Sequence, residues 1–389
     1  MNILIICTLY PPHVLGGAEI SISLLAEGLV ENGHQVSVIT TGNEYSEEIR
    51  NGVKVYRLKN RNIYWRYPQR DKSILKKSLW HLIDIYNWRY KKDVKRIVSK
   101  IKPDIINTSN LCGISSIVWD VVHKMKIPIV HTLRDYYLLC PQQTMIKGTT
   151  SCEKQCAICK TYSIVKKEMS QKVDAVVGIS NFILQHHLSF GYFKNAIRKE
   201  VISNSIDFVS EQNKSVTNSL GYIGRLSPEK GIEYMIEAFL KSTNQNKKLL
   251  IAGKGNKDYE QKLRSKYESD KVVFLGSQNQ VSFFKMIDLL IVPSLWNEPF
   301  GRVVIEAYAS KVPVFMASNG GLKELQVDNI SWCFDTSQVD SLVNLLNNFN
   351  SSHIDNAAFD EIVNQYSREV IVTKYINLFE DLITKKKGL

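Results

Sequence analysis

Two glutamates bracket a short turn in the second half of the chain. Glu298 and Glu306 have seven residues between them, and Pro-Phe-Gly at 299–301 lies in this interval. A loop carboxylate and a helix carboxylate can both accept hydrogen bonds from ligand hydroxyls. Gly301 stands where the turn passes into a helical pattern, so backbone N–H groups and the positive end of the helix dipole point into the loop. The pattern predicts a site for anions and hydroxyls, although an ordinary helix-start glutamate beside a solvated one fits the same spacing.

Two cations occur in the segment Gly-Arg-Leu-Ser-Pro-Glu-Lys-Gly at 224–231. Arg225 and Lys230 can neutralise the negative charge that develops on a diphosphate leaving group. Transferases that use a divalent ion for this purpose carry Asp-x-Asp, which the sequence lacks. The segment therefore predicts diphosphate binding by side-chain cations, without a catalytic metal.

The first half contains two further candidate segments. Gly16 and Gly17 precede a helical pattern and allow the backbone to come close to a phosphate or a sugar. The Gly-x-Gly-x-x-Gly fingerprint is absent, which argues against a dinucleotide dehydrogenase. His131 stands at the end of a predicted strand, and Arg134 and Asp135 follow it. Arg134 offers fixed donors for a phosphate or a hydroxyl, whereas a lone histidine at a strand end is more often structural.

Four cysteines lie within 20 residues: Cys140, Cys152, Cys156 and Cys159. Their spacing fits a tetrahedral structural zinc site. The loop that contains them has little apolar content, and a metal would hold it together. Free thiols and an iron–sulfur cluster are the alternatives.

Alternating apolar runs and helical patterns position all of these residues. Short apolar runs occur at 3–7, 36–40, 105–107, 128–132, 173–180, 220–224, 249–252, 272–276, 289–292 and 312–315. A helical pattern covers 74–100. Alternation of this kind predicts α/β domains with parallel sheets that are covered on both faces. The length of 389 residues suggests two or three domains.

The net charge of +12 comes from one segment. Residues 54–102 contain 16 Lys or Arg and three Asp, a balance of +13, with aromatic residues interleaved at 64, 65, 67, 80, 86, 88 and 90. This composition favours docking on an anionic lipid surface. A nucleic-acid groove, or solvated helices whose aromatic residues face the core, would have the same composition.

No apolar run approaches the roughly 18 residues of a membrane span. The N-terminus lacks the basic start of a signal peptide and reaches Pro11-Pro12 soon after its first apolar run. We therefore expect a cytoplasmic protein with reduced cysteines.

Taken together, these segments resemble the retaining, nucleotide-sugar-dependent glycosyltransferases of the GT-B fold, a large family that includes many bacterial polysaccharide and lipid glycosyltransferases. Three matches carry the resemblance: Glu298-x7-Glu306 with its Pro-Phe-Gly, the 224–231 loop, and Pro-Pro-x-x-x-Gly-Gly-Ala-Glu at 11–19. It implies two Rossmann-like domains that face a central cleft. Residues 1–205 would form the acceptor-side domain with the Cys-rich loop 140–159, residues 206–368 the donor domain, and residues 369–389 a helix that crosses back.

The resemblance also implies roles for individual residues. Arg225 and Lys230 would neutralise the diphosphate, aided by N–H groups around Phe300 and Gly301. Glu306 would hold the ribose and Glu298 the sugar hydroxyls. Leu275 would lie beside the base, and Gly16 and Gly17 on the phosphate side. Many relatives have a histidine immediately before the residue that matches Asp135. Here Arg134 stands in that place and His131 lies three residues earlier, so either could contact the sugar.

Retention at the anomeric carbon would follow from departure and attack on the same face, without an enzymic nucleophile. The expected acceptor is a glycan or a polyprenyl-diphosphate-linked glycan, and the expected location is peripheral, on the inner face of the plasma membrane. A non-hydrolysing sugar-nucleotide epimerase is the main alternative. A basic nucleic-acid-binding protein is a further, less favoured alternative. Nucleic acid is therefore not among the expected partners.

Overall fold

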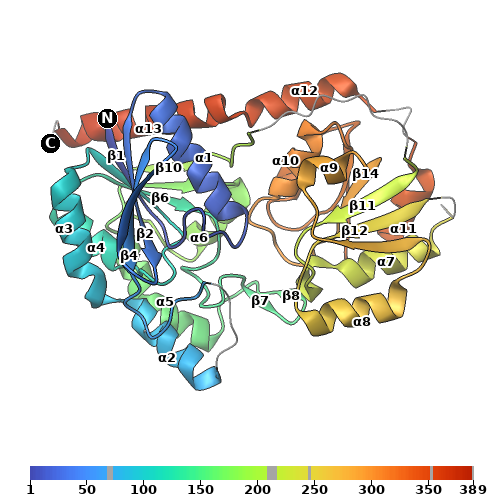
Figure 1. The fold of residues 1–389 in the computed structure, drawn as a ribbon, viewed down its shortest axis with the longest axis horizontal. Helices are drawn as coiled ribbons and strands as arrows, with labels where there is room; N and C mark the ends of the chain where they lie inside the picture. The colour runs from blue at the N-terminus through green and yellow to red at the C-terminus, as the bar shows by residue number, and fades with distance from the viewer. Residues whose placement is uncertain (68–72, 208–216, 244–246, 351–353, 388–389) are drawn as a thin grey trace. The chain divides into compact units, whose positions relative to one another are not determined.

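The structure is a computed structural model, and its chain forms two compact units (Figure 1). Unit 1 contains Met1–Met145, Glu153–Ser205 and Arg368–Leu389, and unit 2 contains Ile146–Cys152 and Ile206–Ser367. The residues that the structure describes are 1–67, 73–207, 217–243, 247–350 and 354–387. Within these ranges, no helix is both long and apolar enough to cross a bilayer.

Unit 1 is built on an eight-stranded sheet. Its strands are β1 (Asn2–Ile6), β2 (Gln35–Gly42), β3 (Ser46–Arg50), β4 (Val53–Lys59), β5 (Ile105–Ser109), β6 (Ile129–Leu133), β9 (Ala175–Gly178) and β10 (Arg198–Val201). Their spatial order is β10-β9-β6-β5-β1-β2-β4-β3, and every neighbouring pair is parallel except β3 and β4. The apolar run in β1 is buried, as expected for a parallel sheet covered on both faces.

The helices of unit 1 are α1 (Gly17–Glu31), α2 (Ile74–Ile85), α3 (Lys91–Ile101), α4 (Ile117–Lys124), α5 (Ala157–Ser170), α6 (Asn181–Ser189) and α13 (Arg368–Lys387). The prediction of one helix over 74–100 is wrong, because a short 3-10 turn at Trp88–Tyr90 separates α2 from α3. Contacts to the loop after β5 hold the chain at this break. The Asp84 carboxylate accepts from the Gly113 N–H at 2.6 Å, and the Asn87 N–H donates to Ser115 Oγ at 2.8 Å.

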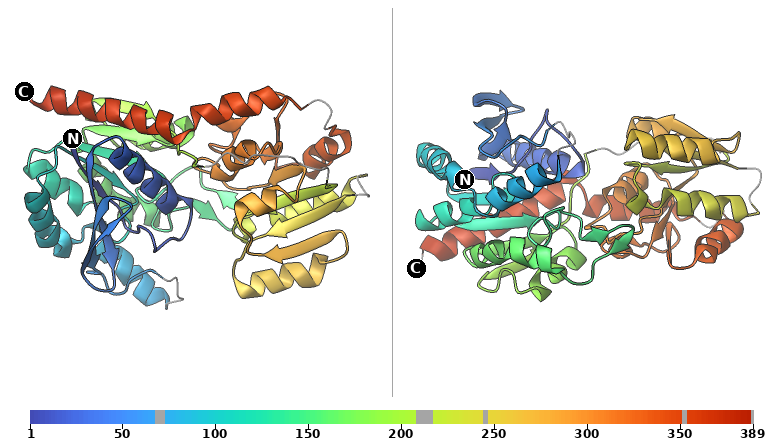
Figure 2. Two further views of the ribbon diagram at one scale, coloured as in Figure 1. Left: turned by 45° about the horizontal axis from the view of Figure 1, so that its top comes forward. Right: turned by 90° about the horizontal axis from the view of Figure 1, so that it is seen from below.

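The C-terminal helix α13 belongs to the core of unit 1 and runs beside α1 (Figure 2). Its buried apolar side chains are Ile371, Val372, Tyr375, Leu378, Phe379 and Leu382. They join the same hydrophobic cluster as residues of β1 and α1. The final residues of the chain therefore contribute to the stability of the domain that contains the first ones.

Unit 2 is built on a six-stranded parallel sheet in the order β13-β12-β11-β14-β15-β16. Its strands are β11 (Ser219–Ile223), β12 (Lys248–Ala252), β13 (Val272–Gly276), β14 (Leu289–Val292), β15 (Val314–Ala317) and β16 (Ser331–Phe334). Its helices are α7 (Ile232–Lys241), α8 (Lys257–Tyr267), α9 (Gln280–Phe284), α10 (Arg302–Ala309), α11 (Val339–Asn348) and α12 (Asn356–Gln365). A small antiparallel hairpin, β7 (Ile146–Lys147) and β8 (Thr150–Ser151), is grouped with unit 2, although its residues lie within the predicted first domain.

Candidate functional site

The strand order of unit 2 determines where its candidate site lies. From β11 the chain continues to β12 on one side, and β14 pairs with β11 on the other side. This reversal creates a switch point at the carboxyl ends of β11 and β14, the place where open α/β sheets bind ligands. The loop 224–231 leaves β11, and the loop 293–301 leaves β14. The two segments predicted to bind a diphosphate and hydroxyls therefore start from adjacent strands.

These two loops touch backbone to backbone. Gly231 has φ +72°, and a Cβ at this position would lie 2.0 Å from the Pro293 carbonyl oxygen. The Leu295 N–H donates to the Glu229 carbonyl at 2.9 Å. Only glycine fits both the positive φ and the close approach, so Gly231 fixes the separation of the loops.

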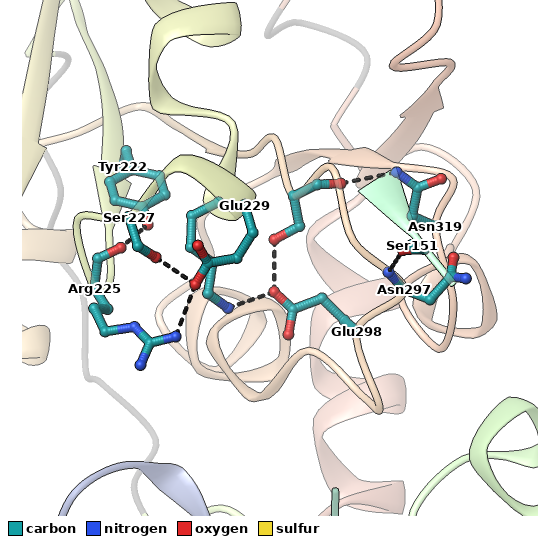
Figure 3. Close-up of polar contacts among 10 residues, drawn as sticks. Ser151, Tyr222, Arg225, Ser227, Glu229, Asn297, Glu298 and Asn319 are labelled. Atoms are coloured by element: carbon teal, nitrogen blue, oxygen red, sulfur yellow. Dashed lines mark hydrogen bonds and ion pairs between the residues drawn. The ribbon is translucent and has the colours of Figure 1, made fainter. Parts of the chain in front are cut away.

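Lys230 and Glu298 form the central ion pair of the site. Lys230 Nζ lies 2.6 Å from Glu298 Oε1, and Ser294 Oγ donates to the same oxygen at 2.6 Å (Figure 3). The Lys230 side chain is 22% exposed and that of Glu298 is 13% exposed, so partial burial strengthens their attraction. Lys230 Nζ also lies 5.4 Å from the centroid of the Trp296 ring. The pair places a cation and a hydroxyl acceptor side by side.

A second ion pair lies on the 224–231 loop. Arg225 Nη2 is 2.8 Å from Glu229 Oε1, and Ser227 Oγ donates to that oxygen at 2.6 Å (Figure 3). Burial raises the pKa of Glu229, but the hydrogen bonds from Ser227 and the charge of Arg225 outweigh this effect and hold the pKa below its usual value. The Arg225 side chain is more than half exposed. Its guanidinium can therefore reach a ligand from solvent.

Three hydrogen bonds support the loop that carries Glu298. The Asn297 N–H donates to Ser151 Oγ at 2.8 Å, which brings in the β7–β8 hairpin (Figure 3). Asn319 Nδ2 donates to the Ser294 carbonyl at 2.8 Å, and the Gly321 N–H donates to the Glu298 carbonyl at 2.7 Å. These contacts fix the backbone on both sides of the carboxylate.

Glu306 has a different environment from Glu298. It lies inside α10, is 2% exposed, and has both oxygens bonded: Oε1 to Arg302 Nε and Oε2 to Gln280 Nε2, each at 2.6 Å. Burial raises the pKa of Glu306, and Arg302 opposes this shift. Gly301 directly precedes α10 and has φ +127°, in the turn predicted at this position, and Phe300 before it is buried.

Leu275 lies apart from these loops. It is near the end of β13, an edge strand that β12 and β11 separate from β14. Its side chain is half-buried, and its carbonyl accepts from Gln278 Nε2 at 2.9 Å. The position beside a base that the resemblance implies for Leu275 stays a prediction.

In unit 1, the glycine pair lies at the start of α1. Gly16 and Gly17 are exposed, and the Glu19 carboxylate accepts from the Gly16 N–H at 2.9 Å. A Cβ on Gly16 would meet no atom of the protein within 4 Å. The space where a Gly16 side chain would lie is therefore open to a ligand. The Gly16 N–H itself is already bonded to the Glu19 carboxylate.

His131 lies in the hydrophobic core and is 4% exposed. Its ring stacks on Phe193 and meets Trp119 edge-on, and its Nδ1 lies 2.9 Å from Thr108 Oγ1. Burial lowers the pKa of His131 to about 3. These neutral and aromatic partners are typical of a structural histidine, and the sugar contact considered for His131 stays a prediction.

Arg134 and Asp135 lie just beyond β6. Arg134 is 8% exposed and donates to Asn204 Oδ1. Asp135 is half-buried, and its carboxylate accepts from the Tyr137 N–H at 2.8 Å. Burial raises the pKa of Asp135 to about 6. A role for either residue at a sugar stays a prediction.

The four cysteines of the 140–159 loop are not joined by disulfide bonds, and their environments differ. Cys140 is buried, Cys156 is exposed, and Cys152 and Cys159 are intermediate. Cys156 caps α5 by accepting from the Cys159 N–H at 3.5 Å. Among the residues whose structure is described, no group of three or more His, Cys, Asp or Glu side chains is arranged to hold a metal ion. The structural zinc stays a prediction, and metal analysis of the purified chain would test it.

The structure adds residues that the sequence analysis did not select. Five polar residues support the predicted groups: Ser151, Ser294, Asn319, Gln280 and Arg302. Arg302 and Glu306 are four residues apart on a helix, a spacing that the sequence alone could have identified as an ion pair. Ser151 and Asn297 are 146 positions apart, and no sequence signal links them.

Comparisons with known proteins cover both units. Residues 15–209 match the family described as Glycosyltransferase Family 4, and residues 203–366 match Glycosyl transferases group 1. An uncharacterized 42.6 kDa protein in the cps region of Klebsiella pneumoniae is 38% identical over 349 residues, which cover 88% of this chain and 92% of that protein.

Two solved structures share the overall fold. Sucrose-phosphate synthase from Thermosynechococcus elongatus matches with a TM-score of 0.74 at 18% identity, over 98% of this chain and 99% of that one. HepE from Anabaena, in complex with UDP and glucose, matches with a TM-score of 0.70 at 18% identity, over 98% and 100% of the two chains.

Proposed function

The chain belongs to the group 1 glycosyltransferases and has the GT-B fold, and from this premise we propose that it transfers a sugar from a nucleoside-diphosphate sugar bound by unit 2. The observation that carries the proposal is the ion pair of Lys230 with Glu298 at the switch point. A site that handles a sugar diphosphate needs cations for the phosphates and a carboxylate for the sugar hydroxyls, next to one another. The match to HepE, whose complex holds UDP and glucose, supports a donor of this class.

In the proposed complex, Arg225 and Lys230 bind the diphosphate. Both cations are held by carboxylates in the described structure, and the phosphates would take over part of that role. As the bond to the sugar breaks, negative charge grows on the leaving diphosphate, and the two cations stabilise it more strongly than they stabilise the ground state. N–H groups around Phe300 and Gly301 would add to this stabilisation.

The two glutamates have separate roles in this proposal. Both contacts of Glu298 use Oε1, so Oε2 is the atom that we assign to a sugar hydroxyl. Glu306 would hold the ribose. Because its two oxygens are bonded to Arg302 and Gln280, a ribose hydroxyl would have to replace the Gln280 amide. Departure and attack on the same face would retain the configuration at the anomeric carbon.

The proposed acceptor is a glycan or a polyprenyl-diphosphate-linked glycan used for cell-surface polysaccharide, bound by unit 1. The open space at Gly16 supports a ligand on that unit. The proposed location is the inner face of the plasma membrane, which is where a lipid-linked acceptor would be reached.

A thermal-shift screen against UDP-, GDP-, ADP- and dTDP-sugars tests the donor site. A ligand at about 100 times its Kd adds about 2.7 kcal/mol to stability. We expect one nucleotide to raise the Tm of the wild type and of Lys262→Ala, and to have little effect on Lys230→Ala. Lys262 is the matched control, because it pairs with Glu233 on exposed helix surface of the same unit.

An absence of any shift for all four nucleotides would contradict the proposal. If a donor binds, product analysis without an acceptor separates the alternatives. An epimerised sugar nucleotide would identify an epimerase, whereas a sugar nucleotide that is only slowly hydrolysed agrees with a transferase.

A further inference from the structure

Arg66 lies in the loop after β4 and differs from neighbouring arginines in its partners. Arg57 pairs with Glu48 at 2.6 Å, and Arg61 pairs with Asp93 at 2.9 Å. Arg66 forms no ion pair within the part of the chain that the structure describes, although it is half-buried. A charge that is partly removed from water and has no counter-ion is costly. A guanidinium in this situation is suited to an anion from outside the chain.

The contacts of the Arg66 side chain are a thiol and an indole ring. Arg66 Nη1 donates to Cys112 Sγ at 3.0 Å, and Gln143 Nε2 donates to the same sulfur at 3.1 Å. The guanidinium carbon lies 5.2 Å from the centroid of the Trp80 ring. Burial raises the pKa of the Cys112 thiol to about 12, so the sulfur is neutral at physiological pH. Neither contact therefore balances the positive charge.

Two acidic residues act on Arg66 from a distance, but both are engaged elsewhere. The Asp84 carboxylate accepts from the Gly113 N–H at 2.6 Å. Burial raises the pKa of Asp84 and of Asp135 to about 6, and in both cases the charge of Lys166 opposes the shift more strongly than that of Arg66. Among the described residues, the buried nitrogen atoms without a partner do not include those of Arg66. Its unpaired N–H groups therefore keep contact with solvent.

The loop that carries Arg66 meets the carboxyl ends of three strands of unit 1. From β1 the chain continues to β2 on one side, and β5 pairs with β1 on the other, so unit 1 has a switch point of its own. Thr8 after β1 donates to the carbonyl of Cys112, which follows β5, at 2.7 Å. Trp65 Nε1 donates to Thr41 Oγ1 near the end of β2 at 3.1 Å. Arg66 and Trp65 are thus held at the edge of the sheet where α/β folds bind ligands.

Partly exposed aromatic rings lie next to this guanidinium in the chain. The ring of His13 meets Trp65 edge-on with the centroids 5.0 Å apart, and its centroid lies 4.8 Å from that of Tyr67. All three residues are half-buried, whereas Trp80 and Tyr90 of the same basic segment are buried. Rings of this kind offer apolar faces to the C–H groups of a sugar, and sites for small molecules combine such faces with a few polar groups.

We propose that Arg66 binds an acidic group of the acceptor, either the carboxylate of a uronic acid or a phosphate, and that Trp65 and His13 contact the sugar next to it. The planar fork of a guanidinium fits the paired oxygens of both groups. The inference rests on the proposed function, because it gives the chemical class of the acceptor of that reaction. Arg66 would make the enzyme select an acidic glycan over a neutral one.

Chemical modification tests the site without knowledge of the complete acceptor. Phenylglyoxal reacts with accessible guanidinium groups, and peptide mass spectrometry identifies each arginine that it modifies. The probes are glucuronate, glucose 1-phosphate and neutral glucose. We expect one of the two acids to slow the reaction of Arg66 by about fivefold, the effect of a ligand at about four times its Kd, while glucose has no effect. The acid that protects distinguishes a carboxylate from a phosphate.

Arg96 is the internal control for this experiment, because it is an exposed arginine of the same unit. Its rate of modification should be the same with all three probes. Failure of Arg66 to react, absence of protection by both acids, or equal protection of Arg66 and Arg96 overturns the proposal.

Substitutions test the selectivity on a glycan array that contains acidic and neutral bacterial glycans. The wild type should prefer acidic glycans, and Arg66→Gln should bind them about tenfold more weakly, because it removes a charged hydrogen-bond donor. Arg66→Lys keeps the charge without the fork and should show an intermediate loss. Arg96→Gln is the matched control and should bind like the wild type. Equal binding by Arg66→Gln, or a wild type that does not prefer acidic glycans, overturns the proposal.

The donor site is measured separately in the same variants. Arg66 belongs to unit 1 and Lys230 to unit 2, so the Tm shift caused by a nucleotide sugar should be the same in the wild type and in Arg66→Gln. This shift also shows that Arg66→Gln is folded. If no nucleotide sugar binds but an acid still protects Arg66, the proposed donor site fails while the acidic-group site stands.

Discussion

The two units place polar side chains on or after parallel strands, but in different environments. After β14 in unit 2, Glu298 pairs with Lys230 from the neighbouring loop, and both side chains keep partial contact with solvent. In unit 1, His131 lies within β6 with neutral partners and aromatic rings around it. The comparison teaches that a polar residue on a parallel strand can be enclosed by the core instead of being presented to a ligand. Two features distinguish Glu298 from His131: a charged partner on the neighbouring loop, and a side chain that keeps contact with solvent.

Lys230→Ala should give the largest effect of the substitutions considered, because it removes a cation from the proposed diphosphate site. Removal of one group that stabilises developing charge costs about 10²–10³-fold in kcat. The loss in kcat is measured as steady-state turnover of the donor identified in the thermal-shift screen, with Lys262→Ala as the control. Equal activity of the two variants would contradict a role of Lys230 at the diphosphate, because Lys230 would then behave like a lysine on ordinary exposed surface.

Glu306→Gln should affect stability as well as donor binding. The substitution leaves the Arg302 guanidinium, which is mostly buried, without its carboxylate, at a cost of about 2–3 kcal/mol in the free energy of unfolding. Denaturant unfolding of Glu306→Gln and Glu298→Gln compares the two glutamates, and only the first should lose stability strongly. Asp360→Asn breaks the more exposed pair with Lys311 and should change stability by less than about 1 kcal/mol.

His131→Leu should destabilise unit 1 by about 1–3 kcal/mol, because it removes the hydrogen bond with Thr108 and the ring contacts, and it should leave the donor Kd unchanged. A changed donor Kd in a variant that remains folded would instead support the predicted sugar contact of His131.

The pH dependence of unfolding gives a second test of the same residue. The pKa of about 3 in the folded state lies below the ordinary value of 6.5, so the unfolded chain takes up the proton first as the pH falls. This contribution to stability is complete above pH 6.5 and is lost towards pH 3. The wild type should therefore lose more stability than His131→Leu over this interval.

Ser151→Ala should give the smallest effect. It removes the acceptor of the Asn297 N–H, whose net contribution is about 0.5–1.5 kcal/mol, so kcat should fall by about three- to tenfold without a comparable loss of stability. Ser151→Thr keeps the hydroxyl and should restore most of the activity. If both variants behave like the wild type, the hairpin does not help to position Glu298.

Much of the fold could be predicted from the sequence. The alternation of apolar runs and helical patterns correctly predicted parallel α/β sheets, because strand and helix periodicities are local properties. The break between α2 and α3 was missed, since it depends on contacts of Asp84 and Asn87 with a loop more than 25 residues away. The Cys spacing predicted a metal site, but spacing along the chain does not determine whether the thiols converge in space.

By itself, the sequence determined which cations and carboxylates belong to the candidate site and which loops carry them, because these follow from residue type and local spacing. Only the tertiary structure decided that Lys230 meets Glu298 across 68 positions, that His131 is enclosed by the core, and that Arg66 lies against a thiol 46 positions away. The physical reason is that pairing and burial depend on strand order and on neighbours distant in the chain. These are fixed only when the sheets assemble.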